Sequence, residues 1–174
     1  MRPEIDLIPL ENIDESVIEA LRIGLKERNC IVRVYAKAKL PKTALNMYRK
    51  QYNAEIIVDA LKELSGNIIA ITDKDLYMDK LNFVFSVAGE KGPALISIHR
   101  LKPEFYQERP NFDRLIERLL KETIYCIGKM TGLKDCQNAK CIMHRAAAAG
   151  EIDFEDTEFC KECKLNNVVE HLKL

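Results

Sequence analysis

The sequence predicts an α/β domain, in which a twisted mixed sheet carries helices on its faces and a small C-terminal subdomain is built around cysteines. The first 35 residues follow a strand, helix, strand pattern. Residues 67–72, NIIAIT, are apolar without alternation, which is typical of a strand covered on both faces. Residues 111–131 have apolar side chains at the three-and-four spacing of a helix buried along one stripe. Strands and helices that alternate in this way favour helices packed on a sheet.

The N-terminal unit begins with residues 5–10, a short apolar run that we expect to be a strand. Asn12 or Asp14 can cap the helix that follows, because their side-chain oxygens accept hydrogen bonds from free backbone N–H groups. The apolar stripe of this helix comprises Val17, Ile18, Leu21 and Leu25. Residues 30–35, CIVRVY, have the β-branched content of a second strand, and we expect the crossover between the two strands to be right-handed.

The segment 36–53 is basic and has no clear period, and we interpret it as a loop with a helical start. Tyr48 and Tyr52 are interleaved with its lysines and arginines, a combination that can contact nucleic acid. A solvated connector is the better interpretation, because the chain as a whole has no net charge. Residues 54–64 then fit a helix that packs on the sheet.

The central part of the sheet is expected to include residues 67–72, followed by two aspartates that we interpret as turn and cap residues. Asp73 and Asp75 stand at a strand end, where paired carboxylates can also serve catalysis, but aspartate commonly hydrogen-bonds its own backbone at such sites. Residues 81–87 and 94–101 flank the sequence GEKG and are predicted to form a hairpin.

The helix predicted at 111–131 is the most regular element of the sequence. Its stripe consists of Phe112, Leu115, Ile116, Leu119, Leu120, Ile124 and Ile127. Asn111 supplies an entry signal, and Gly132 supplies an exit where the chain can turn sharply. The C-terminal tail has Leu165, Val168, Val169 and Leu172 at helical spacing, and we expect it to pack the cysteine-rich segment onto the domain.

Four cysteines between these two helices are spaced as metal ligands. Cys136 and Cys141 form a C-x4-C pair, and Cys160 and Cys163 form a C-x2-C pair 18 residues further on. Zinc prefers four thiolates in a tetrahedron, and two short knuckles deliver two sulfurs each. Two disulfides or four free thiols are the alternative, which is weaker because no signal peptide directs the chain to an oxidising compartment. We therefore predict one structural zinc ion.

The same region resembles the archaemetzincins, a family of metzincin-type zinc metallopeptidases whose signature is HExxHxxGxxHC-x4-C-x-M followed by C-x2-C. The residues here that align with this signature are Gly132, Asp135, Cys136, Cys141, Met143, Cys160 and Cys163, of which Asp135 stands at a histidine position. Earlier segments also match in order: RKQYNAEIIVDAL, ITDKDLY, LNFVF and ALISIHRL. The resemblance implies a metzincin-like domain over 1–132 and a C-terminal subdomain over 133–174. It also implies that Met143 lies beneath the active site and that an antiparallel edge strand lines the substrate cleft.

Every catalytic position of that signature is substituted. The three zinc-ligand histidines correspond to Tyr125, Lys129 and Asp135, and the catalytic glutamate corresponds to Cys126. The chemistry needs imidazoles one helical turn apart and a carboxylate beside the metal-bound water. A lysine ammonium has three donors and no lone pair for a metal. We therefore expect no zinc hydrolysis by the family mechanism, and no catalytic zinc.

Because the resemblance directs positions 125, 129 and 135 to one place, we predict that Lys129 and Asp135 form an ion pair there, with a hydrogen bond from Tyr125. Two separately solvated charges are an equally good interpretation. A further alternative is an altered metal centre or a thiol nucleophile that uses Cys126 and Asp135, with His144.

Composition limits the remaining possibilities. A chain of 174 residues with 47% apolar residues is large enough for one compact domain. Its 27 basic and 27 acidic residues balance, so nucleic acid is not an expected partner. No run is long and apolar enough to span a membrane, and we expect a cytoplasmic protein. The predicted function is an inactive metallopeptidase homologue that keeps its cleft edge for a peptide or protein partner. An active hydrolase with an altered centre and a zinc-ribbon nucleic-acid binder are the alternatives.

Overall fold

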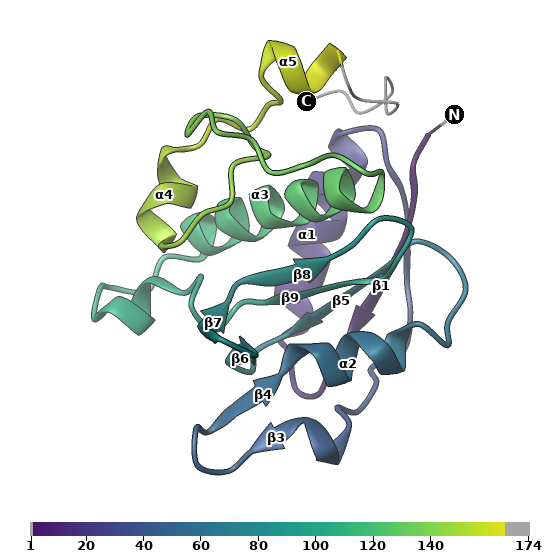
Figure 1. Ribbon diagram of the computed structural model, residues 1–174, viewed down its shortest axis with the longest axis vertical. Helices are drawn as coiled ribbons and strands as arrows, with labels where there is room; N and C mark the ends of the chain where they lie inside the picture. The colour runs from purple at the N-terminus through teal and green to yellow at the C-terminus, as the bar shows by residue number, and fades with distance from the viewer. Residues whose placement is uncertain (1, 166–174) are drawn as a thin grey trace.

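The computed structural model describes residues 2–165 and has two sheets (Figure 1). The main sheet has five strands in the order β2-β1-β5-β9-β8. Its strands are β1 Glu4–Pro9, β2 Ile31–Val34, β5 Ile68–Thr72, β8 Ser86–Ala88 and β9 Ala94–Ser97. All neighbours are parallel except β8, which pairs antiparallel with β9 at one edge. This is the mixed α/β sheet that the sequence predicts.

Helices cover both faces of this sheet (Figure 1). The helices are α1 Glu15–Glu27, α2 Ala54–Leu61, α3 Phe112–Met130, α4 Ala149–Phe154 and α5 Lys161–Leu165, with 3-10 turns at Lys42–Ala44 and Pro103–Tyr106. Alternate residues of one strand point to opposite faces. Accordingly Ile69 and Ile71 belong to the core under α1 and α3, whereas Ile68 and Ala70 belong to the core under α2. The strand predicted to be covered on both faces is therefore central and fully buried.

A small second sheet extends from the main one. It has the strand order β3-β4-β6-β7, formed by β3 Leu45–Asn46, β4 Gln51–Asn53, β6 Leu76–Met78 and β7 Leu81–Val84. The segment 36–53 is largely irregular and contains a 3-10 turn, as predicted, but the prediction missed β3 and β4. The Asn46 side chain accepts hydrogen bonds from the backbone N–H groups of Tyr48 and Arg49, which closes the β3–β4 turn. Strands this short show no alternation that a sequence pattern could reveal.

Two expectations for the central region need correction. Asp75 is more than a turn residue: its carboxylate accepts two hydrogen bonds from Arg100, at 2.8 and 2.7 Å, and one from Gln51 at 2.9 Å. The predicted hairpin is present between β8 and β9, but its first strand is divided. The chain leaves the small sheet after Val84 and enters the main sheet at Ser86. Both corrections depend on contacts between segments that are distant in sequence.

The helix α3 is within one residue of its predicted bounds at each end, because both end signals function as expected. The Asn111 side chain accepts a hydrogen bond from the N–H of Arg114 at 3.0 Å. At the other end Gly132 has φ of 92°, a conformation that residues with a β-carbon rarely adopt. Of the predicted C-terminal helical tail, Leu165 ends α5, and the remaining positions lie outside the described residues. None of the helices described is long and apolar enough to cross a bilayer.

Candidate functional site

The C-terminal half of α3 brings Tyr125 and Lys129 to one side of the helix, four residues and about one turn apart. The turn at Gly132 then reverses the chain, and the N–H of Leu133 bonds to the carbonyl of Gly128 at 2.9 Å. This reversal places Asp135 against the helix. Three positions that are up to ten residues apart in sequence thus meet in space.

At that meeting point the Asp135 carboxylate accepts two hydrogen bonds on the same oxygen. The Lys129 Nζ donates to Oδ1 at 2.8 Å, and the Tyr125 hydroxyl donates to Oδ1 at 2.7 Å. Burial acts to raise the pKa of Asp135, but these two hydrogen bonds outweigh it and hold the pKa below its ordinary value. The predicted Lys129–Asp135 ion pair is confirmed, together with the hydrogen bond from Tyr125. These donors do not fit a second zinc ion, because an ammonium group has no lone pair to offer a metal.

Cys126 and His144, which the altered-centre alternative requires, do not join this group. Cys126 is fully buried, and burial together with the Glu122 carboxyl beside it raises the pKa of its thiol. Lys129 has the smallest influence on that pKa and does not reverse it. The His144 ring lies 3.2 Å from the carbonyl oxygen of Cys136 and 3.8 Å from the Glu151 carboxylate. A protonated buried thiol is a poor nucleophile and a poor metal ligand.

Met143 is completely buried directly beside α3. A β-carbon at Gly128 would lie 2.3 Å from its sulfur and 3.0 Å from its methyl carbon, so only glycine allows this close approach. The Met143 carbonyl accepts a hydrogen bond from the N–H of Cys136 at 2.8 Å. The turn around Met143 therefore joins the helix to the cysteine cluster.

The four cysteines Cys136, Cys141, Cys160 and Cys163 converge as their spacing predicts. Their sulfurs lie within 4.8 Å of one another, and all four residues are free thiols. Zinc–sulfur bonds of about 2.3 Å in a tetrahedron place the sulfurs about 3.8 Å apart. The Cys136 and Cys160 sulfurs are 3.7 Å apart, which fits that geometry and is far too long for a disulfide. Within residues 2–165 no other group of three or more Cys, His, Asp or Glu side chains brings its ligand atoms together in this way.

Backbone donors also suit thiolate ligands at this cluster. The N–H groups of Met143 and Cys160 point at the Cys141 sulfur, at 3.5 and 3.2 Å, and the N–H of Asn138 points at the Cys136 sulfur at 3.5 Å. Such donors stabilise negative sulfur and orient it toward a metal. The donor set therefore fits a structural zinc ion, which the four cysteines would hold.

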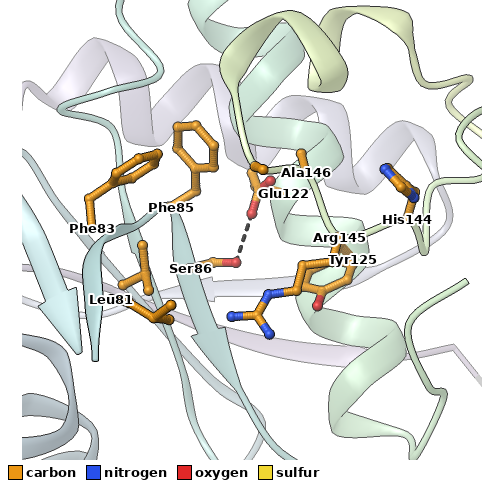
Figure 2. Close-up of a pocket in the computed structure, with 11 residues that line it drawn as sticks. Leu81, Phe83, Phe85, Ser86, Glu122, Tyr125, His144, Arg145 and Ala146 are labelled. Carbon is orange, nitrogen blue, oxygen red and sulfur yellow. Dashed lines mark hydrogen bonds between the residues drawn. The ribbon is translucent and has the colours of Figure 1, made fainter. Parts of the chain in front are cut away.

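A pocket of about 280 Å³ opens beside Tyr125 (Figure 2). It lies between residues 81–86, where the chain passes from β7 to β8, and residues 144–147 after Met143. Its walls are mainly apolar and are formed by Leu81, Phe83, Val84, Phe85, Ala146 and Ala147. Its polar lining comes from Ser86, Glu122, Tyr125, His144 and Arg145. Of the edge strand β8, Ser86 lines this pocket, and the neighbouring wall comes from β7 and from Phe85 between the two strands.

Glu122 is the residue in this pocket that the sequence analysis missed. It is buried in α3, and its carboxylate accepts a hydrogen bond from the Ser86 hydroxyl at 2.7 Å (Figure 2). Burial raises the pKa of Glu122 to about 7, although the Ser86 hydrogen bond acts in the opposite direction. Its position three residues before Tyr125, on the same side of the helix, was the available signal. A charged residue in an amphipathic helix is ordinarily taken to face solvent.

Comparison with known proteins gives consistent matches along the chain. Residues 5–168 match peptidase family M54. The archaemetzincin of Methanocaldococcus jannaschii is 35% identical over 156 residues, which cover 89% of this chain and 87% of that protein. The crystal structure of archaemetzincin from Archaeoglobus fulgidus complexed with malonate has a TM-score of 0.83 at 29% identity, covering 94% of this chain and 99% of that one. A zinc-dependent peptidase from Methanocorpusculum labreanum has a TM-score of 0.79 at 27% identity, covering 92% and 98%.

Proposed function

The chain belongs to peptidase family M54, the archaemetzincins, and from this premise we propose that it is a zinc-binding member that has lost peptide hydrolysis. One observation carries the proposal. The three positions that the resemblance assigns to catalytic zinc ligands are joined by hydrogen bonds on the Asp135 carboxylate, from Lys129 and Tyr125. A cation of the protein thus takes the place of the metal cation. Hydrolysis would also lack its general base, because the catalytic glutamate is replaced by the buried Cys126.

The cysteine cluster supports retention of one structural zinc ion. The fit of the Cys136 to Cys160 sulfur distance to a tetrahedron, and the N–H groups that point at the sulfurs, favour metal over free thiols. One zinc ion per chain is therefore proposed, with no second ion at Lys129. We also propose a cytoplasmic location, because a site of four zinc-binding thiolates requires a reducing compartment.

The partner that we propose is an extended peptide bound along the edge strand β8. This strand is the last in the main sheet, so its outer edge is not paired with another strand of residues 2–165. An extended peptide can add to such an edge through main-chain hydrogen bonds, which require no metal. The pocket beside β8 offers a place for one of its side chains.

Nucleic acid is a poorer candidate. Arg49, in the basic segment, donates hydrogen bonds to the carbonyls of Leu81 and Asn82 and stacks on the Tyr77 ring at 4.2 Å. It therefore holds the small sheet together and is not available for phosphates. The balanced charge of the chain offers no other basis for binding a polyanion.

Metal content and peptidase activity test the proposal together. We expect one zinc per purified chain by mass spectrometry of the metal, and no cleavage of a mixed library of fluorogenic peptides. The matched variant restores the family residues as Tyr125→His, Cys126→Glu, Lys129→His and Asp135→His, and its zinc content shows whether a second ion can enter. Two zinc ions per wild-type chain, or cleavage that a chelator abolishes, would overturn the proposal.

A further inference from the structure

The pocket beside β8 has apolar walls and, at its opening, one cation that no side chain of residues 2–165 binds. Leu81, Phe83 and Phe85 come from the divided strand, and Ala146 and Ala147 come from the segment after Met143. A cavity of about 280 Å³ accommodates one large side chain but not a folded element. Burial of an apolar side chain there removes from water both the surface of that side chain and the apolar walls of the pocket. The shape and the walls therefore select an apolar side chain.

The cation is Arg145, which is exposed and lines the same pocket. Figure 2 shows its side chain reaching from the segment after Met143 toward β8. Among residues 2–165 no hydrogen bond or ion pair engages its guanidinium group. Its charge helps to lower the pKa of Asp135, but more weakly than Lys129 and Tyr125, which already bond that carboxylate. A guanidinium fork presents donors that match a carboxylate.

The other polar groups of the pocket cannot bind an anion, because hydrogen bonds within the protein already engage them. Tyr125 donates its hydroxyl to Asp135, and His144 lies against the Cys136 carbonyl and Glu151. Glu122 is bound by Ser86, and because burial raises its pKa to about 7, it is largely uncharged in mildly acidic solution and does not then repel an anion. Arg145 is thus the group that can attract a ligand charge.

We propose that this pocket binds the free carboxyl terminus of an extended peptide, with the last side chain between the phenylalanines and the terminal carboxylate on Arg145. The inference rests on the proposed peptide-binding function and specifies its ligand. An apolar side chain and a carboxylate attached to the same α-carbon occur only at a chain end. An internal aspartate or glutamate side chain would have to bring its charge between apolar walls, which is costly. A C-terminal residue can place its apolar side chain between the walls and its carboxylate on Arg145 at the same time.

The test compares one peptide in two forms on the zinc-loaded chain. The probe is an N-terminally labelled Ala-Ala-Ala-Leu with a free carboxylate, and the comparison is the same peptide as its C-terminal amide, both titrated by fluorescence anisotropy and by backbone NMR at about pH 6. We expect the acid to bind at least about tenfold more tightly, the low end of what a hydrogen bond between charged groups contributes. The NMR shifts are expected at Ser86 and Arg145. The difference between the two forms should decrease as salt is added.

Two variants that each remove one positive charge distinguish binding of the carboxylate by Arg145 from a general effect of the protein's charge. Arg145→Gln should remove the preference for the acid, whereas Lys134→Gln, which removes an exposed positive charge outside the pocket, should keep it. Ala147→Phe places a large side chain in the pocket from an exposed position, and it should weaken the binding of both the acid and the amide. Because these three residues are exposed, the variants are expected to fold.

The outcomes distinguish this inference from the function on which it rests. If the acid and the amide bind equally at β8, peptide binding stands and the carboxyl-terminal assignment is overturned. If an amidated peptide with an internal glutamate binds as tightly as the free acid, the site takes any carboxylate, and the assignment is again overturned. If neither form binds, both the inference and the proposed peptide-binding role are overturned.

Discussion

The Lys129–Asp135 ion pair should stabilise the fold by an amount that a double-mutant cycle can measure. The perturbation is Lys129→Met, Asp135→Ala and the two together. Lys129→Met keeps the length of the side chain and removes its charge, and Asp135→Ala removes the acceptor of both hydrogen bonds. The coupling energy is the part of the combined effect that the single variants do not explain.

Its size follows from distance and exposure. The Nζ to Oδ1 distance is 2.8 Å, and the side chains of Lys129 and Asp135 are 23% and 35% exposed. Hydrogen bonds to charged groups contribute about 1.5–3 kcal/mol when they are sheltered. Exposed ion pairs contribute about 0.2–1 kcal/mol, because water and side-chain entropy offset the attraction. A half-sheltered pair lies between these limits, and we expect a coupling energy of about 1 kcal/mol.

Urea denaturation of the zinc-loaded chain gives the four free energies of unfolding that the cycle requires. The chain also supplies a matched control. Lys62 and Asp59 are the same residue types at a similar distance, 2.7 Å, but their side chains are 60% and 69% exposed. The cycle of Lys62→Met and Asp59→Ala should give a coupling energy of less than about 0.5 kcal/mol. A Lys129–Asp135 coupling no larger than this control would refute the view that the pair replaces the metal as a structural link.

Three further perturbations follow from the site. Cys136→Ser should release most of the bound zinc and cost several kcal/mol, part of the roughly 10–16 kcal/mol that structural zinc contributes in isolated fingers; unchanged metal content and melting temperature would contradict this. The pKa of Glu122 is raised from 4.5 to about 7 in the folded chain. Its contribution to the free energy of unfolding is therefore fully present below pH 4.5 and is lost as pH rises toward 7. At about 1.4 kcal/mol per pH unit this loss is about 3 kcal/mol at most. Glu122→Gln should make the free energy of unfolding less dependent on pH than in the wild type, as measured by unfolding at several pH values. Gly128→Ala should cost about 1–2 kcal/mol despite its better helix propensity, because the new β-carbon would meet the buried Met143 sulfur; a rise in melting temperature would argue against that contact.

Elements with a strong local period were predictable, and short elements were not. The stripe of α3 and its two end signals located the helix to within one residue at each end, because a helix of that length repeats its pattern over several turns. The small sheet was missed because β3 and β4 have only two and three residues. These strands are held by contacts with a distant segment, since Arg49, in the turn between them, donates hydrogen bonds to the carbonyls of Leu81 and Asn82.

The candidate site was predictable where a motif fixed it. The substitutions at positions 125, 126, 129 and 135 and the paired cysteines are visible in the sequence alone. Their spacing, together with the resemblance, predicted both the meeting of Lys129 with Asp135 and the convergence of the four sulfurs. Glu122 was missed although its spacing from Tyr125 was visible, since the hydrogen bond that distinguishes it comes from Ser86, 36 positions away.

The sequence by itself determined that the family's metal-ligand positions are substituted, because substitution is a property of side-chain identity at fixed positions. It also determined the cysteine knuckles and the long helix, since both arise from local spacing. Only the tertiary structure decided that the Asp135 carboxylate accepts both hydrogen bonds on one oxygen, that Glu122 is buried against Ser86, and that no side chain of residues 2–165 binds Arg145 at the pocket. These features depend on contacts between distant segments, where burial and packing determine which polar groups are neutralised and which are left to bind a partner.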